Sequence, residues 1–263
     1  MSRTNRENLD FCKVADFFRS QTICCFTSDI DWSPEWAIQE MLATFENLEV
    51  PLTLFITHHS ETVKQQYGQK GRFQYVGLHP NFLPSSSHGA SYIEQIDYCQ
   101  RLWPEAKCFR SHKCFDNYLI AKEFHNRGFR YDSNLCLFLQ PYCTPLHHCS
   151  GMVRFPIFWE DDVHSEQGFP FKTEAIRNHL NRPGLKVFNF HPLSFSLNTP
   201  TTKYYLSHKF LYEKKDVQWH RYVFEGVGER TFLMNLVAHL KKKRTRLSYL
   251  DDLYNELPTL TEG

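Results

Sequence analysis

The stretch ICCFTSDIDWSPEWAIQEMLATFENLEVPLTLFIT, residues 23–57, decides the fold class of this chain. It begins with the β-compatible run Ile23–Thr27 and ends with a second such run, Leu52–Thr57. Between them, Ser33 and Pro34 are typical of a helix start. Apolar residues then recur at helical spacing and predict one buried face, made of Ile38, Met41, Leu42 and Phe45. A strand–helix–strand unit of this kind predicts a right-handed crossover between two parallel strands.

The same alternation continues along the chain. Strands are predicted at 75–79, 108–109, 153–159, 185–190 and 247–250, and helices at 91–103, 118–126 and 231–242. Residues 194–227 are irregular and aromatic-rich, which favours an insertion or a lid. No Gly/Ser linker divides the sequence, so we predict a single α/β domain over residues 1–263, built on one parallel sheet or barrel.

Composition and charge exclude several classes of protein. Lys and Arg together number 30 and Asp and Glu 29, so the net charge of +1 gives no general attraction for nucleic acid or an anionic membrane. The dense basic cluster Lys241–Arg246 is interpreted as a solvated helix end. No window reaches the roughly 18 consecutive apolar residues of a membrane-spanning helix. Nine scattered cysteines and no export signal predict reduced thiols in a cytoplasmic protein.

Metal-competent and charged side chains stand just past the ends of five predicted strands. Because the carboxyl ends of parallel strands converge on one rim, where active sites form, we expect these side chains to lie together. One aspartate with two histidines is a ligand set that suits zinc or another divalent transition metal with open positions. In chain order the candidates are Asp29 and Asp31, His79 with His88, Arg110, Asp161 and Asp162, and His191.

Several of these residues stand in segments that match known motifs. The segments are TSDIDW (27–32), GLHPNF (77–82) with His88 beyond it, FR (109–110), GFRYDSN (128–134), FPIFWEDD (155–162) and NFHP (189–192). In this order they resemble the motifs of the polysaccharide deacetylase (NodB-type) superfamily. The motif residues are most similar to those of its WbmS-like branch, which is associated with bacterial surface-polysaccharide gene clusters. The resemblance covers residues 23–193 and implies a distorted (β/α) barrel, which residues 194–263 would complete.

The resemblance also implies a divalent metal, zinc before others, held by Asp31, His79 and His88. The sequence departs from the family pattern at three points. The two aspartates of the first motif are separated by one residue rather than adjacent. The second histidine usually stands four residues after the first, where this chain has Leu83, so His88 has to loop back to the metal. The third motif usually has Pro two residues after its Arg, where this chain has His112.

The other motif residues receive roles in amide hydrolysis from the same resemblance. Asp29 would be the general base toward the attacking water, and Arg110 would hold the Asp29 carboxylate in place. His191 would be the general acid for the departing nitrogen, with Asp161 or Asp162 orienting its imidazole.

These roles predict a hydrolase that removes an N-acetyl or other N-acyl group from a nucleotide- or lipid-linked sugar of surface-polysaccharide assembly. Two alternatives remain open. A small-molecule amidohydrolase would use the same residues on another C–N bond, and a catalytically idle barrel would only bind glycan. Metal content separates the idle protein from the enzymes, and a substrate panel separates the two enzymes from each other.

Overall fold

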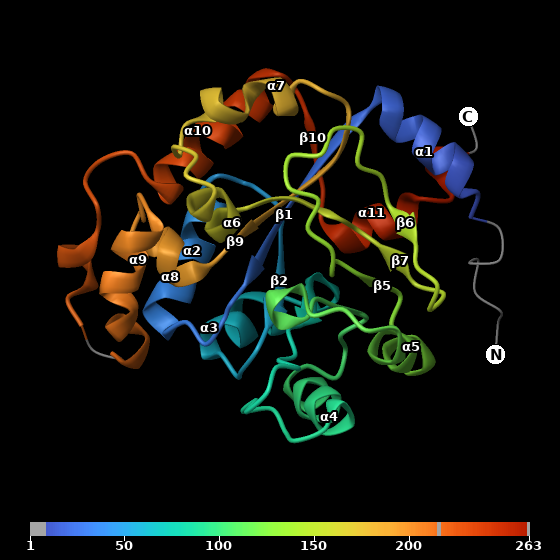
Figure 1. Ribbon diagram of the computed structural model, residues 1–263, viewed down its shortest axis with the longest axis horizontal. Coiled ribbons are helices and arrows are strands. Elements are labelled where there is room, and N and C mark those ends of the chain that lie inside the picture. The colour runs from blue at the N-terminus through green and yellow to red at the C-terminus, as the bar shows by residue number, and fades with distance from the viewer. Residues whose placement is uncertain (1–8, 215–216, 262–263) are drawn as a thin grey trace.

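The computed structural model describes residues 9–214 and 217–261, which form a strongly curled, mostly parallel sheet wrapped by helices (Figure 1). β6 and β7 pair antiparallel, and the other paired strands are parallel. The predicted α/β class and distorted barrel are confirmed. From edge to edge the strands are β6 (Leu146–His147), β7 (Val153–Arg154), β5 (Tyr131–Asp132), β4 (Cys108–Phe109), β3 (Val76–Leu78), β2 (Leu52–Ile56), β1 (Thr22–Asp29), β9 (Gly184–Phe190) and β8 (Ile157–Glu160).

Two strands that are neighbours in the sequence bring the edges of the sheet together. β7 pairs with β5 near one edge, whereas β8, which begins only three residues after β7, is the strand at the opposite edge. The sheet therefore has to curl, and backbone N–H groups of Leu137 and Leu139 donate across the gap to carbonyls of β8. The single strand predicted at 153–159 is wrong, because Pro156 has no N–H for a strand ladder and divides it.

β1 lies at the centre of the sheet and is buried from its second residue to its end. β9 pairs with it on one side, and on the other side β2 pairs with its second half. β10 (Arg246–Leu247) continues that side beside Ile23 and Cys24, so the C-terminal part of the chain contributes to the sheet. The last predicted strand, 247–250, is shorter than expected because α11 (Leu250–Glu256) begins there.

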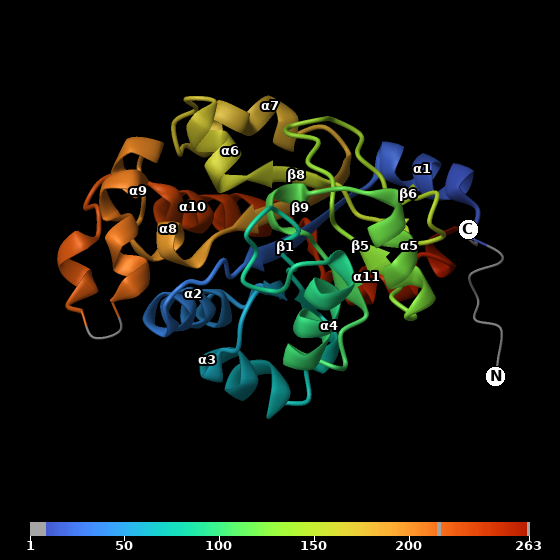
Figure 2. The same cartoon turned by 60° about the horizontal axis from the view of Figure 1, so that its bottom comes forward.

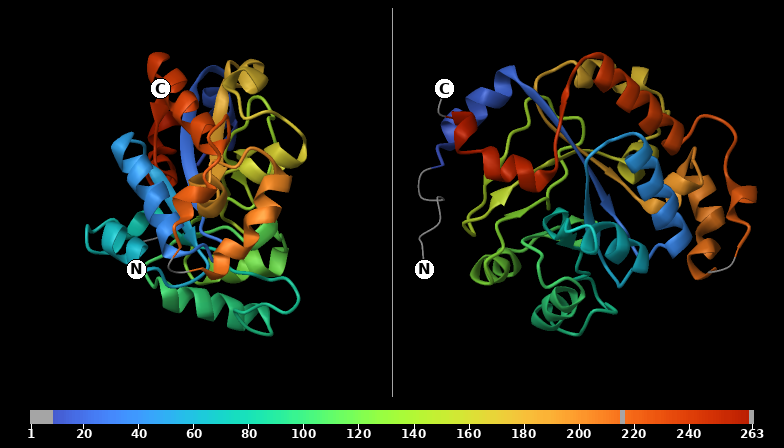
Figure 3. Two further views of the ribbon diagram at one scale, coloured as in Figure 1. Left: turned by 90° about the vertical axis from the view of Figure 1, so that its left-hand side faces the viewer. Right: turned by 180° about the vertical axis from the view of Figure 1, so that it is seen from behind.

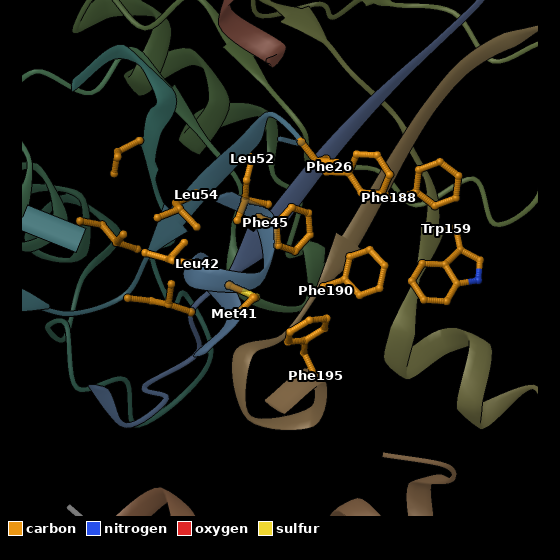
Figure 4. Packing of buried hydrophobic residues seen from close by; sticks show 14 of the residues in the cluster. Phe26, Met41, Leu42, Phe45, Leu52, Leu54, Trp159, Phe188, Phe190 and Phe195 are labelled. Atoms are coloured by element: carbon orange, nitrogen blue, oxygen red, sulfur yellow. The ribbon is translucent and has the colours of Figure 1, made fainter. Parts of the chain in front are cut away.

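Helices cover the outside of the curled sheet (Figure 3). The predicted face of α2 (Glu35–Asn47) is buried as expected, and Figure 4 shows Met41 and Phe45 of this helix facing Phe26 of β1 and Phe190 of β9. The remaining helices are α1 (Phe11–Ser20), α3 (Glu61–Val63), α4 (Tyr92–Leu102), α5 (Tyr118–Asn126), α6 (Asp161–Glu166), α7 (Arg177–Leu180), α8 (Pro192–Ser196), α9 (Thr202–His208) and α10 (Glu229–Lys242). Among the described residues, none of these helices combines the length and the hydropathy needed to cross a membrane.

The aromatic-rich segment after β9 packs as a small unit at one end of the molecule (orange in Figure 1). It contains α8, α9 and two 3-10 turns, and its own apolar cluster is built around Leu193, Leu197 and Leu211. Trp219 of this unit stacks on Trp36 of α2, with ring centroids 5.0 Å apart. The unit is therefore attached to the helix that follows β1, on the side of the strand end that carries Asp29.

Candidate metal centre and active site

Five strand ends place polar side chains at one rim of the barrel. Asp29 ends β1, His79 follows β3, Arg110 follows β4, Glu160 ends β8 and His191 follows β9. The first four are at most 8% exposed. The convergence expected from parallel strands is observed, since potential ligand atoms of Asp29, Glu160 and His191 lie within 4.8 Å of one another.

A second group at this rim consists of Asp31, His79 and His112. Oδ1 of Asp31 lies 3.1 Å from Nε2 of His79 and 3.0 Å from Nδ1 of His112. Asp31 leaves the strand direction through a tight turn, with a φ of 38°, and the following residue also has a positive φ. Burial favours the neutral acid, but hydrogen bonds from His112 and His79 outweigh it and hold the pKa of Asp31 well below its usual range.

His112 reaches this position because its loop is fixed at both ends. The His112 N–H donates to the carbonyl of Pro80, 2.9 Å away, which joins the loops after β3 and β4. Asn134 accepts from the Ser111 N–H at 3.0 Å and donates to the Phe115 carbonyl at 2.9 Å. The segment GFRYDSN therefore helps to build the site by holding the His112 loop.

His88, the expected third ligand, is not in this group. Its Nδ1 accepts a hydrogen bond from the Asn81 N–H at 3.1 Å, and its ring stacks on Tyr98 with centroids 4.7 Å apart. Burial, with the nearby His79, lowers the pKa of His88 to about 4. His112 therefore takes the place expected of His88 beside Asp31 and His79, while Nε2 of His88 is buried without a hydrogen-bond partner among the described residues.

The residues Asp31, His79 and His112 fit a divalent transition metal. Their ligand atoms all lie within 4.8 Å of one another, and two imidazoles with one carboxylate are a donor set that zinc accepts while keeping an open position. Nδ1 of His79 is buried without a hydrogen-bond partner among the described residues and lies 3.7 Å from Oδ1 of Asp29. A neutral His79 that binds a cation through Nε2 carries its proton on Nδ1, where the Asp29 carboxylate faces it.

Asp29 is held by two polar partners. Arg110 donates to its Oδ1 at 2.9 Å and Asn189 donates to its Oδ2 at 2.9 Å. The Arg110 guanidinium is fully buried and also donates to the carbonyl and the hydroxyl of Ser133, at 2.9 and 2.8 Å. These contacts fix the Asp29 carboxylate beside the Asp31 group, which is the position that the general-base role requires.

His191 is paired with Asp161 rather than with Asp162. Nδ1 of His191 lies 2.6 Å from Oδ1 of Asp161, and the His191 N–H donates to Oδ2 at 2.7 Å. The Asp162 side chain is exposed and its Oδ1 accepts from the Val163 N–H. Burial opposes the charged imidazole, but the Asp161 carboxylate outweighs it and raises the pKa of His191 well above its usual value. Nε2 of His191 lies 3.7 Å from Oδ2 of Asp31, so it faces the site.

Glu160 and Asn189 belong to the site although the sequence analysis gave neither of them a role: Glu160 was noted only as one of the acidic residues after Trp159. Asn189 bridges the two carboxyl groups, donating to Asp29 and, at 3.0 Å, to Oε1 of Glu160. Burial raises the pKa of Glu160 to about 8, with the negative charges of Asp162 and Asp29 acting in the same direction. The signal was present, since both residues stand inside the motif segments FPIFWEDD and NFHP next to residues that were chosen.

The His112→Ala variant is expected to weaken zinc binding by about 100-fold, because one imidazole of the ligand group is lost, whereas His88→Ala keeps most of the affinity. Loss of a residue that only supports a metal ligand already costs about 10–100-fold in metal affinity, so loss of a ligand is expected at or above the upper end of this range. Competition titration with a chromogenic chelator measures both variants. The opposite ranking, with His88→Ala losing the metal and His112→Ala keeping it, would return His88 to the ligand set.

In the metal-free protein, the free energy of unfolding is expected to fall as pH rises. Glu160→Gln should abolish the part of this fall that comes from Glu160. The folded protein binds the Glu160 proton with a pKa of about 8, against 4.5 for an ordinary Glu, so between these values the unfolded chain holds fewer protons. The free energy of unfolding therefore falls with rising pH, by at most about 1.4 kcal/mol per pH unit from this group. Urea unfolding across this range measures it, with the exposed Glu166→Gln as the control. An unchanged slope in Glu160→Gln would contradict the buried neutral carboxyl.

Comparison with known proteins agrees with this geometry. The WbmS-like polysaccharide deacetylase family matches residues 26–209, which include every residue of the site described above. A structure from Bordetella bronchiseptica, provisionally described as a polysaccharide deacetylase involved in O-antigen biosynthesis, is 28% identical to this chain. The alignment covers 84% of this chain and 91% of that chain, with a TM-score of 0.73.

Other solved structures match the chain at lower sequence identity. A protein from Mycobacterium smegmatis, also provisionally described as a polysaccharide deacetylase, is 15% identical over 88% of this chain and 94% of that chain, with a TM-score of 0.47. A pseudoenzyme from Bacillus anthracis is 12% identical over 90% of this chain and 67% of that chain, also at 0.47. Similarity at this level carries no functional argument, and no curated protein matches the chain. Because the family match covers residues 26–209, which are most of the chain, the chain belongs to the WbmS-like family of polysaccharide deacetylases.

Proposed function

We propose that this protein is an active, metal-dependent hydrolase that removes an N-acetyl or other N-acyl group from a sugar of surface-polysaccharide assembly. One observation supports this most strongly. Asp31 lies at the meeting point of the site, with His79 and His112 at its Oδ1 and the acid candidate His191 3.7 Å from its Oδ2. The base candidate Asp29 is held beside the same group, so ligand, base and acid functions are all present.

The ligand group and the base would prepare the attack. Asp31, His79 and His112 would hold a divalent metal, which when bound would supply a Lewis acid for the acyl carbonyl and lower the pKa of water. Asp29 accepts the proton of the attacking water, so that the water oxygen forms the new bond to the acyl carbon. Arg110 and Asn189 hold both oxygens of the Asp29 carboxylate, which keeps the base oriented before the substrate arrives.

The acid completes the cleavage. When the bond between the acyl carbon and the nitrogen breaks, the nitrogen needs a proton, and His191 provides it from Nε2, the nitrogen that faces the site. Asp161 holds the imidazole through Nδ1 and stabilises its charged form. The products are a free amine on the sugar and a carboxylic acid, and one water molecule is consumed.

The substrate class and the compartment are part of the proposal. The Bordetella relative is described as involved in O-antigen biosynthesis, and we take the substrate class from that description: a nucleotide- or lipid-linked N-acylated sugar. The nine cysteines are free thiols in the structure, which agrees with a reducing compartment, so we place the enzyme in the cytoplasm.

The test is the release of acetate and of a free amine. Zinc-loaded protein is incubated with a panel of nucleotide- and lipid-linked N-acetyl sugars, and both products are quantified, with Asp29→Asn as the matched control. Equal amounts of acetate and amine, absent in the variant, support the proposal. Hydrolysis of cyclic imides or ureides without activity on any acylated sugar would overturn the substrate class. If the metal-loaded protein hydrolyses neither the acylated sugars nor the cyclic imides and ureides, the proposed activity is overturned.

A further inference from the structure

A buried carboxyl group lies behind the acid end of the site and has no part in the reaction described above. Glu229 is the first residue of α10 and is 0% exposed. Neither of its carboxyl oxygens has a hydrogen-bond donor within ordinary geometry among the described residues. Its polar neighbours are the carboxyl group of Asp161 and the hydroxyl group of Ser194. A carboxyl group without a cation in such a place cannot remain ionised at low cost.

The backbone fixes Glu229 relative to His191. The Glu229 N–H donates to the Thr199 carbonyl at 3.0 Å, and the Asn198 side chain accepts from the Thr231 N–H in the same turn of the helix at 3.1 Å. Gly228 lies so close to the Asn198 carbonyl that a Cβ there would be 1.9 Å from the oxygen, so the start of α10 is pressed onto this loop. The loop directly follows α8, the helix that begins after His191, and Figure 2 shows α8 and α10 side by side.

Only one of the two neighbouring carboxyl groups can keep its charge. Asp161 has His191 as a cationic partner, and both of its oxygens already accept hydrogen bonds from His191. Although burial favours the neutral acid, His191 holds the pKa of Asp161 below its usual value. Among the described residues Glu229 has no hydrogen-bonded or ion-paired cation, and burial, with the adjacent Asp161, raises its pKa well above the ordinary value. Burial and the His191–Asp161 pairing therefore favour a neutral Glu229 beside an ionised Asp161.

We propose that Glu229 is a positioning residue that donates a hydrogen bond from its neutral carboxyl group to Asp161, and so keeps that carboxylate directed at His191. This inference rests on the proposed function of the same site. The C-terminal part of the chain, which carries no motif, thereby has a role. Through Glu229, α10 extends the hydrogen-bonded pair of His191 and Asp161 by a third residue. These hydrogen bonds hold the imidazole so that Nε2 remains directed at the site.

Two variants separate positioning from simple packing. Glu229→Gln keeps a donor toward Asp161, whereas Glu229→Leu fills the space without one, and the exposed Glu225→Gln serves as the control. The full-length, zinc-loaded protein is used throughout. On an N-acetyl sugar that the wild type hydrolyses, we expect kcat to stay within about threefold in Glu229→Gln and to fall about tenfold or more in Glu229→Leu, with KM little changed. Equal losses in both variants would overturn the inference.

Two spectroscopic readouts need no substrate, so they distinguish failure of this inference from failure of the proposed function. The infrared difference spectrum between the wild type and Glu229→Gln at neutral pH should contain the carbonyl band of one neutral carboxylic acid, because the band of Glu160 is common to both proteins and cancels, whereas the difference between the wild type and Glu225→Gln should contain none. The NMR signal of the His191 Nδ1 proton should shift in Glu229→Leu and stay in place in Glu229→Gln. Absence of this band from the difference between the wild type and Glu229→Gln contradicts the inference, and this comparison stands even if Glu229→Leu does not fold.

Discussion

Asp29→Asn is expected to lower kcat by about 10²–10⁴-fold while the protein keeps its fold and its metal. The substitution preserves the size of the side chain, and the amide oxygen can still accept from Arg110, which donates to Asp29 Oδ1 at 2.9 Å. It removes the carboxylate that takes the proton of the attacking water. Because Asp29 lies beside the Asp31 group and outside it, metal content should remain that of the wild type. Steady-state kinetics and elemental analysis of the same preparation measure both quantities.

Asp162→Asn is the matched control for this experiment. Its carboxylate belongs to the same rim but is exposed, and among the described residues its Oδ1 accepts from the neighbouring Val163 N–H. We expect its kcat to remain within a few-fold of the wild type. Activity of Asp29→Asn close to that of Asp162→Asn would place the base elsewhere.

His191→Ala is expected to lower the rate on acetamide substrates by about 10²–10⁴-fold and to affect an activated aryl acetate far less. An amide nitrogen is a poor leaving group until it is protonated, whereas an aryl oxide leaves without a proton. His191 is held by Asp161 at 2.6 Å with Nε2 facing the site, which is the arrangement that a proton donor needs. The measurement is the ratio of kcat/KM on the two substrate types, in the wild type and in the variant.

Metal content again provides the control, since His191 lies outside the group formed by Asp31, His79 and His112. Equal losses on the amide and the ester would show that His191 acts in binding or in support of the metal.

Asp161→Asn should move the alkaline limb of the pH profile of activity to lower pH, because the carboxylate that raises the pKa of His191 is gone. A limb that stays in place would assign it to another group.

Most of the site could be predicted from the sequence because parallel strands end at the same rim. Asp29, Asp31, His79, Arg110 and His191 needed only a correct assignment of their strands. The choice between His88 and His112 could not be made in this way. Sequence spacing does not reveal which loop turns toward the metal, and here His88 is held by the Asn81 backbone and stacked on Tyr98. The departure from Pro at position 112 was the sequence feature that marks His112, the ligand that we propose.

The parts of the fold that the sequence did not predict depend on contacts between distant segments. The run 153–159 looks like one strand, but Pro156 lies where the chain passes from one edge of the barrel to the other. Glu229 gave no signal either, because a glutamate in the first turn of a helix is ordinarily explained by the helix dipole. Only the packing of α10 against the loop after α8 reveals that this glutamate is buried next to Asp161.

The central claim is that Asp31, His79 and His112 together hold the catalytic metal. Anomalous diffraction at the zinc absorption edge, from crystals of the zinc-loaded protein, tests it most directly. We expect one strong peak, about 2.0–2.2 Å from the Asp31 carboxylate, Nε2 of His79 and Nδ1 of His112. His88 should still accept its hydrogen bond from the Asn81 N–H. A peak coordinated by His88 in place of His112, or no peak at Asp31, would contradict it.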